Sequence, residues 1–319
     1  MINDWQQLLD GMLNGSVRNL GRLITKIENR DQGWLDAMKT IHSNGKNALV
    51  VGITGAPGAG KSTLTNRITR DLLARGKTVG IVAIDPSSPF SGGALLGDRI
   101  RMGEVSNKDS VFVRSMATRG ALGGLSVAAR DVVKIIDAFG KDIILIETVG
   151  VGQDEVDVVK TADIVLVVCV PGMGDGIQAI KAGIMEIADI FVVNKADRED
   201  ADQVVTDIET MLNMRSHLDP WIIPIFKTTA STGKGVKALV DSLLYNFEPG
   251  CKKNKVKENM VKEEIFCLVE KEVARHVRSS WNKNEMFENI VKEVINRQRN
   301  PYAVVEDMIK NLFNLGNYQ

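Results

Sequence analysis

The feature that most constrains this chain is the run Gly55-Ala-Pro-Gly-Ala-Gly-Lys-Ser62, which fits the pattern G-x-x-x-x-G-K-[ST]. Apolar residues 48–54 before it are typical of a buried strand, and residues 62–74 after it repeat apolar side chains at helical spacing. A glycine-rich turn between a strand and a helix N-terminus binds phosphate, because backbone N–H groups and the helix dipole attract an anion. The sequence therefore predicts a nucleoside triphosphate site in this turn.

The residues of the turn have different expected tasks. Lys61 is expected to reach the β- and γ-phosphates, and the Ser62 hydroxyl is expected to ligate Mg²⁺. The residues predicted to enclose the phosphates are Gly55, Ala56, Pro57, Gly58, Ala59, Gly60, Lys61, Ser62 and Thr63.

Apolar segments that alternate with helical ones continue along the middle of the chain. The predicted strands are residues 48–54, 79–84, 111–114, 143–147, 164–170, 190–194 and 222–227. Their continuous Val and Ile runs indicate strands covered on both faces, as in a mostly parallel α/β sheet of the P-loop NTPase type. Because ligands of such sheets bind beyond the carboxyl ends of the strands, we expect the functional residues at that edge.

A second motif, N-K-x-D, follows the predicted strand 190–194 and consists of Asn194, Lys195 and Asp197. A carboxylate here can accept hydrogen bonds from N1–H and the 2-amino group of guanine, which adenine lacks at that edge. A site built around such an acceptor rejects the base that leaves it unpaired. The motif predicts guanine recognition, and Thr229, Ala230 and Ser231 are expected to add backbone contacts to the base.

Acidic residues at other strand ends suggest a metal site and a switch. Glu147 ends an apolar strand, where an acid would hold Mg²⁺ or its water shell, and Gly150 is placed to sense the γ-phosphate. The loop that starts at Asp85 and includes Asp98 predicts a switch segment that orders around the metal and the γ-phosphate.

Two further glycine-rich loops follow strands. Arg119 lies in the first of them, and it could neutralise phosphate charge or pair with a carboxylate of a partner protein. The second loop, residues 171–181, places Gln178 and Lys181 where they could contact a partner protein.

Composition limits the partners and the compartment. Lys+Arg and Asp+Glu number 40 each, so no overall field favours nucleic acid or an anionic membrane. The three cysteines show no C-x-x-C spacing, and no secretory or transit signal is visible at the N-terminus. The longest apolar run, residues 164–170, is too short to span a bilayer. We expect a cytoplasmic protein that binds neither nucleic acid nor membrane.

Three zones are expected along the chain. Residues 1–45 form a helical extension broken at Gly11, Gly15 and Gly33, and residues 46–248 form the nucleotide-binding domain. Residues 249–319 begin with a polar linker and continue as an amphipathic helical arm from Asn259. We expect this arm to pack on a second subunit, giving a homodimer.

Together these motifs resemble the MeaB/ArgK/MMAA family of P-loop GTPases. The resemblance rests on the phosphate loop, Gly21-Arg-Leu-Ile-Thr-Lys-Ile-Glu28, Ile84-Asp-Pro-Ser-Ser-Pro89, Gly97-Asp-Arg-Ile-Arg-Met102, Arg114-Ser-Met-Ala-Thr-Arg-Gly120, Glu147-Thr-Val-Gly-Val-Gly-Gln153 and the N-K-x-D motif. It implies a homodimeric GTPase chaperone that gates cofactor loading, protection and reactivation of an adenosylcobalamin-dependent methylmalonyl-CoA or related acyl-CoA mutase. It also implies a metal site at Ser62, Asp85, Asp98 and Glu147, catalytic roles for Lys61 and those three acids, and a third switch at residues 171–181.

Two other functions stay open. One is a nucleotide-dependent kinase associated with lysine, arginine and ornithine transport, which would need an acceptor hydroxyl and a base that no motif here marks. The other is a GTPase that delivers nickel, which would need a Cys/His cluster near the switches. For the GTPase we expect slow, partner-stimulated attack of water on the γ-phosphate, since no motif residue is an obvious catalytic base.

Overall fold

The computed structural model describes residues 2–85, 110–117, 124–148, 162–172, 187–215, 223–245, 254–281 and 285–313. The chain divides into two compact units, Met1–Lys257 and Glu258–Gln319.

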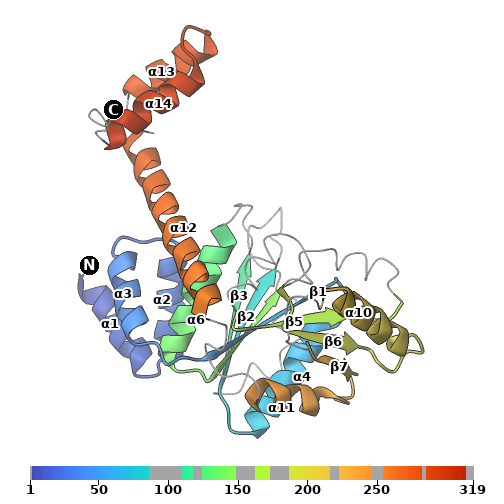
Figure 1. Ribbon diagram of the computed structural model, residues 1–319. Coiled ribbons are helices and arrows are strands. Elements are labelled where there is room, and N and C mark those ends of the chain that lie inside the picture. The colour runs from blue at the N-terminus through green and yellow to red at the C-terminus, as the bar shows by residue number, and fades with distance from the viewer. Residues whose placement is uncertain are drawn as a thin grey trace. The chain divides into compact units, whose positions relative to one another are not determined.

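The first unit is built on a parallel sheet of seven strands in the order β3-β2-β4-β1-β5-β6-β7 (Figure 1). The strands are β1 Leu49–Gly55, β2 Val79–Asp85, β3 Val111–Ala117, β4 Ile143–Thr148, β5 Ile164–Cys169, β6 Ile190–Asn194 and β7 Ile225–Thr228. Every residue of β4, β5 and β6 is buried, as their continuous apolar sequences predict. The predicted α/β fold with a parallel sheet is confirmed.

Several strand boundaries differ from the prediction by one to three residues, and β3 ends at Ala117 instead of residue 114. Strand β7 begins at Ile225, whereas the sequence predicts a start at residue 222. Pro224 explains the later start, because proline has no N–H to donate to the ladder. Its carbonyl still accepts a hydrogen bond from the N–H of Phe191 (3.0 Å).

Helices cover both faces of the sheet, so that a core lies on each side. Helices α4 (Lys61–Ala74) and α11 (Val236–Tyr245) pack together on one face, over a large cluster of buried Val, Leu and Ile side chains. Helices α6 (Gly124–Phe139) and α10 (Ala201–Arg215) lie on the other face. The predicted helix at residues 62–74 is therefore confirmed as α4, which begins inside the phosphate loop.

Three N-terminal helices belong to the same unit: α1 Ile2–Leu13, α2 Val17–Glu28 and α3 Trp34–Ser43. They bury their apolar faces against one another and against α6. A largely buried ion pair between Arg30 and Asp131 (2.7 Å) joins them to α6. The Ser16 hydroxyl caps α2 by accepting from the N–H of Asn19 (3.3 Å).

The predicted break at Gly11 is wrong, because Gly11 lies inside α1. A Cβ at this position would lie 1.7 Å from Nδ2 of Asn19, so the missing side chain allows α1 to pack closely on α2. The breaks at Gly15 and Gly33 are confirmed, and both glycines have the positive φ that ends or begins a helix.

The second unit contains α12 (Asn254–Trp281), which begins near its boundary, together with α13 (Glu285–Ile295) and α14 (Pro301–Phe313). Helix α12 starts earlier than the predicted Asn259, since the predicted linker ends in residues without glycine or proline to interrupt a helix. No described helix is long and apolar enough to cross a membrane.

Candidate functional site

The motif residues of the described chain meet at one edge of the sheet. Because all seven strands are parallel, their carboxyl ends lie together, and β1 ends there between β4 and β5 (Figure 1). The phosphate loop follows β1, Glu147 lies near the end of β4, and Asn194 ends β6. The expected clustering at this edge is confirmed.

Glycines allow the phosphate loop to approach its neighbours closely. A Cβ on Gly55 would lie 2.2 Å from the carbonyl oxygen of Val168 in β5. Gly60 precedes α4 in the left-handed region, with φ of 86°, and a Cβ there would lie 2.6 Å from Nδ2 of Asn194. The loop is thus held between β5 and the N-K-x-D motif, with the N-terminus of α4 pointing at its interior.

Lys61 is buried and its ammonium group lies at the centre of this loop. Nζ donates to the carbonyl oxygens of Gly55 (2.7 Å) and Ala56 (3.0 Å). The loop therefore holds a positive charge where the helix dipole already attracts an anion, and phosphate oxygens can accept from the same ammonium group.

Ser62 and Glu147 form the second chemical group of the site. The Ser62 hydroxyl donates to Oε1 of Glu147 at 2.5 Å, and the Glu147 side chain is only 5 % exposed. A hydroxyl and a carboxylate are the oxygen ligands that Mg²⁺ prefers. This donor pair fits a divalent cation beside the phosphates.

Asn194, at the end of β6, joins two loops through one buried side chain. Its Nδ2 donates to the carbonyl of Ala59 (2.9 Å), and its Oδ1 accepts from the N–H of Ala230 (3.0 Å) and the hydroxyl of Thr228 (3.2 Å). Lys195 adds a bond from Nζ to the carbonyl of Gly58 (2.8 Å). These two motif residues couple the phosphate loop to the predicted base-binding loop.

Asp197 differs from them because its side chain is exposed. Among the described residues, no hydrogen bond or ion pair engages its carboxylate. The turn that carries it is closed by bonds from Ala196 N to Thr228 O (3.0 Å) and from Arg198 N to Lys195 O (3.1 Å). A fixed backbone thus presents a carboxylate that can accept hydrogen bonds.

The sequence analysis missed Arg67, which holds the predicted base-binding loop from α4. Nε donates to the carbonyl of Ala230 (3.0 Å) and Nη2 donates to that of Ser231 (2.5 Å). Because Asn194 accepts from the N–H of Ala230, both the N–H and the carbonyl group of Ala230 are held by side chains. The two bonded positions are 163 residues apart, and no motif links them.

Several predicted residues lie outside the described part of the chain. Asp85 ends β2 at the expected edge, but its side chain is not described. The others that lie outside are Asp98, Arg119, Gly150, Gln178 and Lys181. The predicted third switch is described only at its start, where the carbonyl of Pro171 accepts from Nη1 of Arg198 (3.4 Å).

Cys169 lies near this edge, at the end of β5, and is 8 % exposed. Burial raises the pKa of its thiol to about 12, because the charged thiolate would lose its hydration. The side chain therefore stays a neutral thiol near neutral pH. Within the described residues, no group of three or more His, Cys, Asp or Glu side chains could hold a metal ion.

Comparison with known proteins agrees with this geometry. Residues 20–282 match the family model described as methylmalonyl-CoA mutase-associated GTPase MeaB. A Pyrococcus abyssi protein, named only as an inferred GTPase, is 45% identical over 316 residues, which cover 97% of each chain. GTPase ArgK of Escherichia coli is 32% identical, with 80% of this chain and 79% of ArgK covered.

Among solved structures, the chain resembles one titled as a LAO/AO transport system kinase, with a TM-score of 0.65 and 97% of each chain covered. The identity of 23% makes this a likeness of fold. The family match spans the phosphate loop, the N-K-x-D motif and every strand of the sheet. This chain therefore belongs to the MeaB family of GTPases.

Proposed function

We propose that this GTPase is a chaperone of an adenosylcobalamin-dependent methylmalonyl-CoA mutase or a related acyl-CoA mutase. In this role it gates cofactor loading, protection and reactivation of the mutase. The observation that carries the proposal is a guanine-type nucleotide site in a chain matched over residues 20–282 by a mutase-associated GTPase family. Asn194 couples the phosphate loop to the predicted base-binding loop, and this coupling supports a role in signalling the bound nucleotide to a partner.

The proposed chemistry is hydrolysis of GTP to GDP and phosphate. Lys61 would hold the β- and γ-phosphates, and Ser62 and Glu147 would hold Mg²⁺, which neutralises charge on the phosphate oxygens. Asp85 and Asp98 would join the metal and switch groups, and Gly150 would contact the γ-phosphate. Because the described residues offer no evident base for the attacking water, we propose slow intrinsic hydrolysis that the partner accelerates.

A route from the base to the partner loop is available through Arg198. This residue follows Asp197 in the same turn, and its guanidinium donates to the carbonyl of Pro171 (3.4 Å). Residues 171–181 are the proposed third switch, and Gln178 and Lys181 are its proposed contacts to the mutase. The contact between Arg198 and Pro171 therefore connects the turn that carries Asp197 to the start of the proposed partner loop.

The proposed homodimer uses the apolar stripe of α12. Val261, Ile265, Val269 and Val273 recur every fourth residue, and they are 37–54% exposed. Such a stripe favours helix-to-helix packing, because it removes apolar surface from water. We propose that α12 of a second copy covers it.

Replacing Lys61 tests the proposed activity. In Lys61→Ala we expect GTP turnover below about 1% of wild type, because the ammonium group opposite the phosphates is lost. The variant should also lose the GTP-dependent protection of a purified B12-dependent mutase during turnover. Lys237→Ala, an exposed lysine on α11, serves as the control. Near-normal turnover would contradict the assignment, and transfer of labelled γ-phosphate to a protein acceptor would favour the transport kinase instead.

Replacing Asp197 tests guanine recognition. In Asp197→Asn the preference for GTP over ATP, measured as the ratio of kcat/KM values, should fall about 100-fold, since one acceptor becomes a donor. Asp200→Asn, an exposed change in the following turn, should leave the ratio unchanged. An unaltered ratio in Asp197→Asn would remove the basis for assigning guanine to this site.

Replacing Arg67 tests how the base-binding loop is held. Arg67→Met keeps a long side chain but removes both donors to Ala230 and Ser231, so GDP should bind about tenfold more weakly. Pyrophosphate affinity should not change, because that ligand has no base. Arg70→Met, on the same helix, is the control; Arg70 donates to neighbouring Asn66. Equal weakening for GDP and pyrophosphate would mean that Arg67 merely stabilises the fold.

A charge in the α12 stripe tests the dimer. Val269→Asp should weaken the dimer about 100-fold in sedimentation equilibrium, since an unpaired carboxylate would be buried at the interface. Ala274→Asp places the same charge at an exposed position away from the stripe and should leave the dimer intact. Dissociation by both variants, or by neither, would exclude the stripe as the interface.

A further inference from the structure

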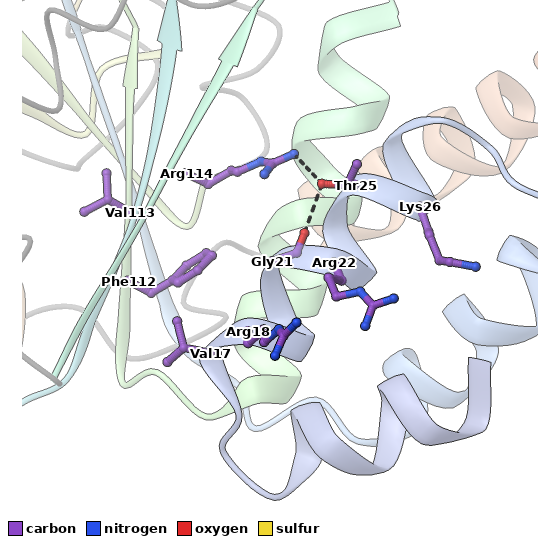
Figure 2. Close-up of a pocket in the computed structure, with 9 residues that line it drawn as sticks. All are labelled: Val17, Arg18, Gly21, Arg22, Thr25, Lys26, Phe112, Val113 and Arg114. Atoms are coloured by element: carbon purple, nitrogen blue, oxygen red, sulfur yellow. Dashed lines mark hydrogen bonds between the residues drawn. The ribbon is translucent and has the colours of Figure 1, made fainter. Parts of the chain in front are cut away.

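A surface trough lies along α2, beside the edge strand β3 (Figure 2). Its volume is about 520 Å³, and its lining among the described residues comes from α2 and β3. None of the predicted nucleotide-site residues that the structure describes lines it. Within the described residues β3 pairs only with β2, so the trough lies at an edge of the sheet. It is therefore a surface separate from the nucleotide site.

Gly21 lies among the trough-lining residues in the middle of α2. A Cβ built on Gly21 meets nothing within 4 Å, so neither packing nor close approach of the described residues requires a glycine here. Glycine weakens a helix interior relative to alanine, because it loses more backbone freedom on folding. The missing side chain keeps the trough open at a cost to helix stability.

Positive charge is concentrated along the trough. Arg18 and Arg22 are exposed and lie one helical turn apart, and neither makes a hydrogen bond or ion pair with the described residues. Lys26, one turn further, is paired with Asp4 (2.8 Å). The hydrogen bond from Lys26, together with the nearby charge of Arg22, lowers the pKa of the Asp4 carboxyl. Because the chain has a formal net charge of zero, this concentration of positive charge is a local feature.

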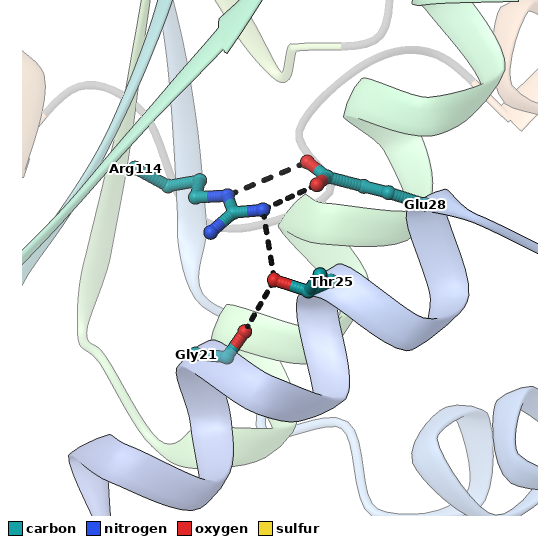
Figure 3. A network of polar contacts seen from close by, with 4 residues as sticks. All are labelled: Gly21, Thr25, Glu28 and Arg114. Carbon is teal, nitrogen blue, oxygen red and sulfur yellow. Dashed lines mark hydrogen bonds and ion pairs between the residues drawn. The ribbon is translucent and has the colours of Figure 1, made fainter.

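The wall of the trough on the β3 side is fixed by a polar network (Figure 3). Arg114 of β3 forms an ion pair with Glu28, and its Nη2 donates to Oγ1 of Thr25 (3.3 Å). The Thr25 hydroxyl in turn donates to the carbonyl of Gly21 (3.0 Å). These bonds hold α2 against β3, so the shape of the trough exists before anything binds.

We propose that this trough docks an acidic segment of the mutase partner, with carboxylates on Arg18 and Arg22 and a side chain over Gly21. This inference rests on the proposed function. The arginines match carboxylates in charge and geometry, and apolar contacts are available from exposed Val17. An open trough that extends along more than two helical turns suits a protein segment, whereas small ligands are largely enclosed by their pockets.

The experiment measures binding of the full-length GTPase to a purified B12-dependent mutase, with GDP and with a non-hydrolysable GTP analogue. Arg18→Gln/Arg22→Gln should associate about tenfold more slowly and show a weaker dependence on ionic strength than wild type. Lys39→Gln/Lys237→Gln removes two exposed helical lysines elsewhere in the first unit and should bind as wild type does.

Gly21→Ala separates docking from stability. We expect its Tm to rise by about 2 °C, because alanine favours the helix, while its affinity for the mutase falls about tenfold. Wild-type affinity in this variant or in the double arginine variant would overturn the docking proposal. So would loss of the homodimer in the arginine variant, since a second copy would then occupy the trough. Failure of wild type itself to bind the mutase would instead refute the proposed function.

Discussion

The nucleotide site depends on one buried amide. Asn194 bonds to the phosphate loop through Ala59 and to the base-binding loop through Ala230, so two loops far apart in sequence take up one arrangement. Because the amide is 2 % exposed, an unpaired donor or acceptor there would lose its hydration without replacement. Lys195 and Arg67 strengthen the same connection from either side.

The parallel sheet explains why these groups can meet. Strands β1, β4, β5 and β6 lie side by side in register, and their carboxyl ends lie at the same edge. Almost every residue of these strands is buried, whereas loops tolerate changes in sequence more readily. The phosphate- and base-binding residues thus lie on loops that begin at fixed strand ends. The trough on α2 lies elsewhere on the first unit.

Much of this arrangement could be predicted from the sequence. Runs of Val and Ile indicated all seven strands, and the two motifs indicated the phosphate and base loops, because their spacing reflects local backbone geometry. Contacts between distant side chains left no such pattern. Arg67 and the Arg114–Glu28 pair depend on how helices pack. The sequence predicts a helix break at Gly11, because the close approach to Asn19 leaves no sign in the local sequence.

The span of the Asn194 bonds also has a consequence for folding. Its partner Ala59 is 135 residues away, so the site cannot form until both halves of the sheet have assembled. A nucleotide that binds only the completed site stabilises it by mass action, by about 4 kcal/mol when free nucleotide exceeds the dissociation constant about 1,000-fold. Guanine nucleotide would then stabilise the folded state as well as serve as a substrate. The concentration of nucleotide in the cell would therefore influence the fraction of the protein that is folded.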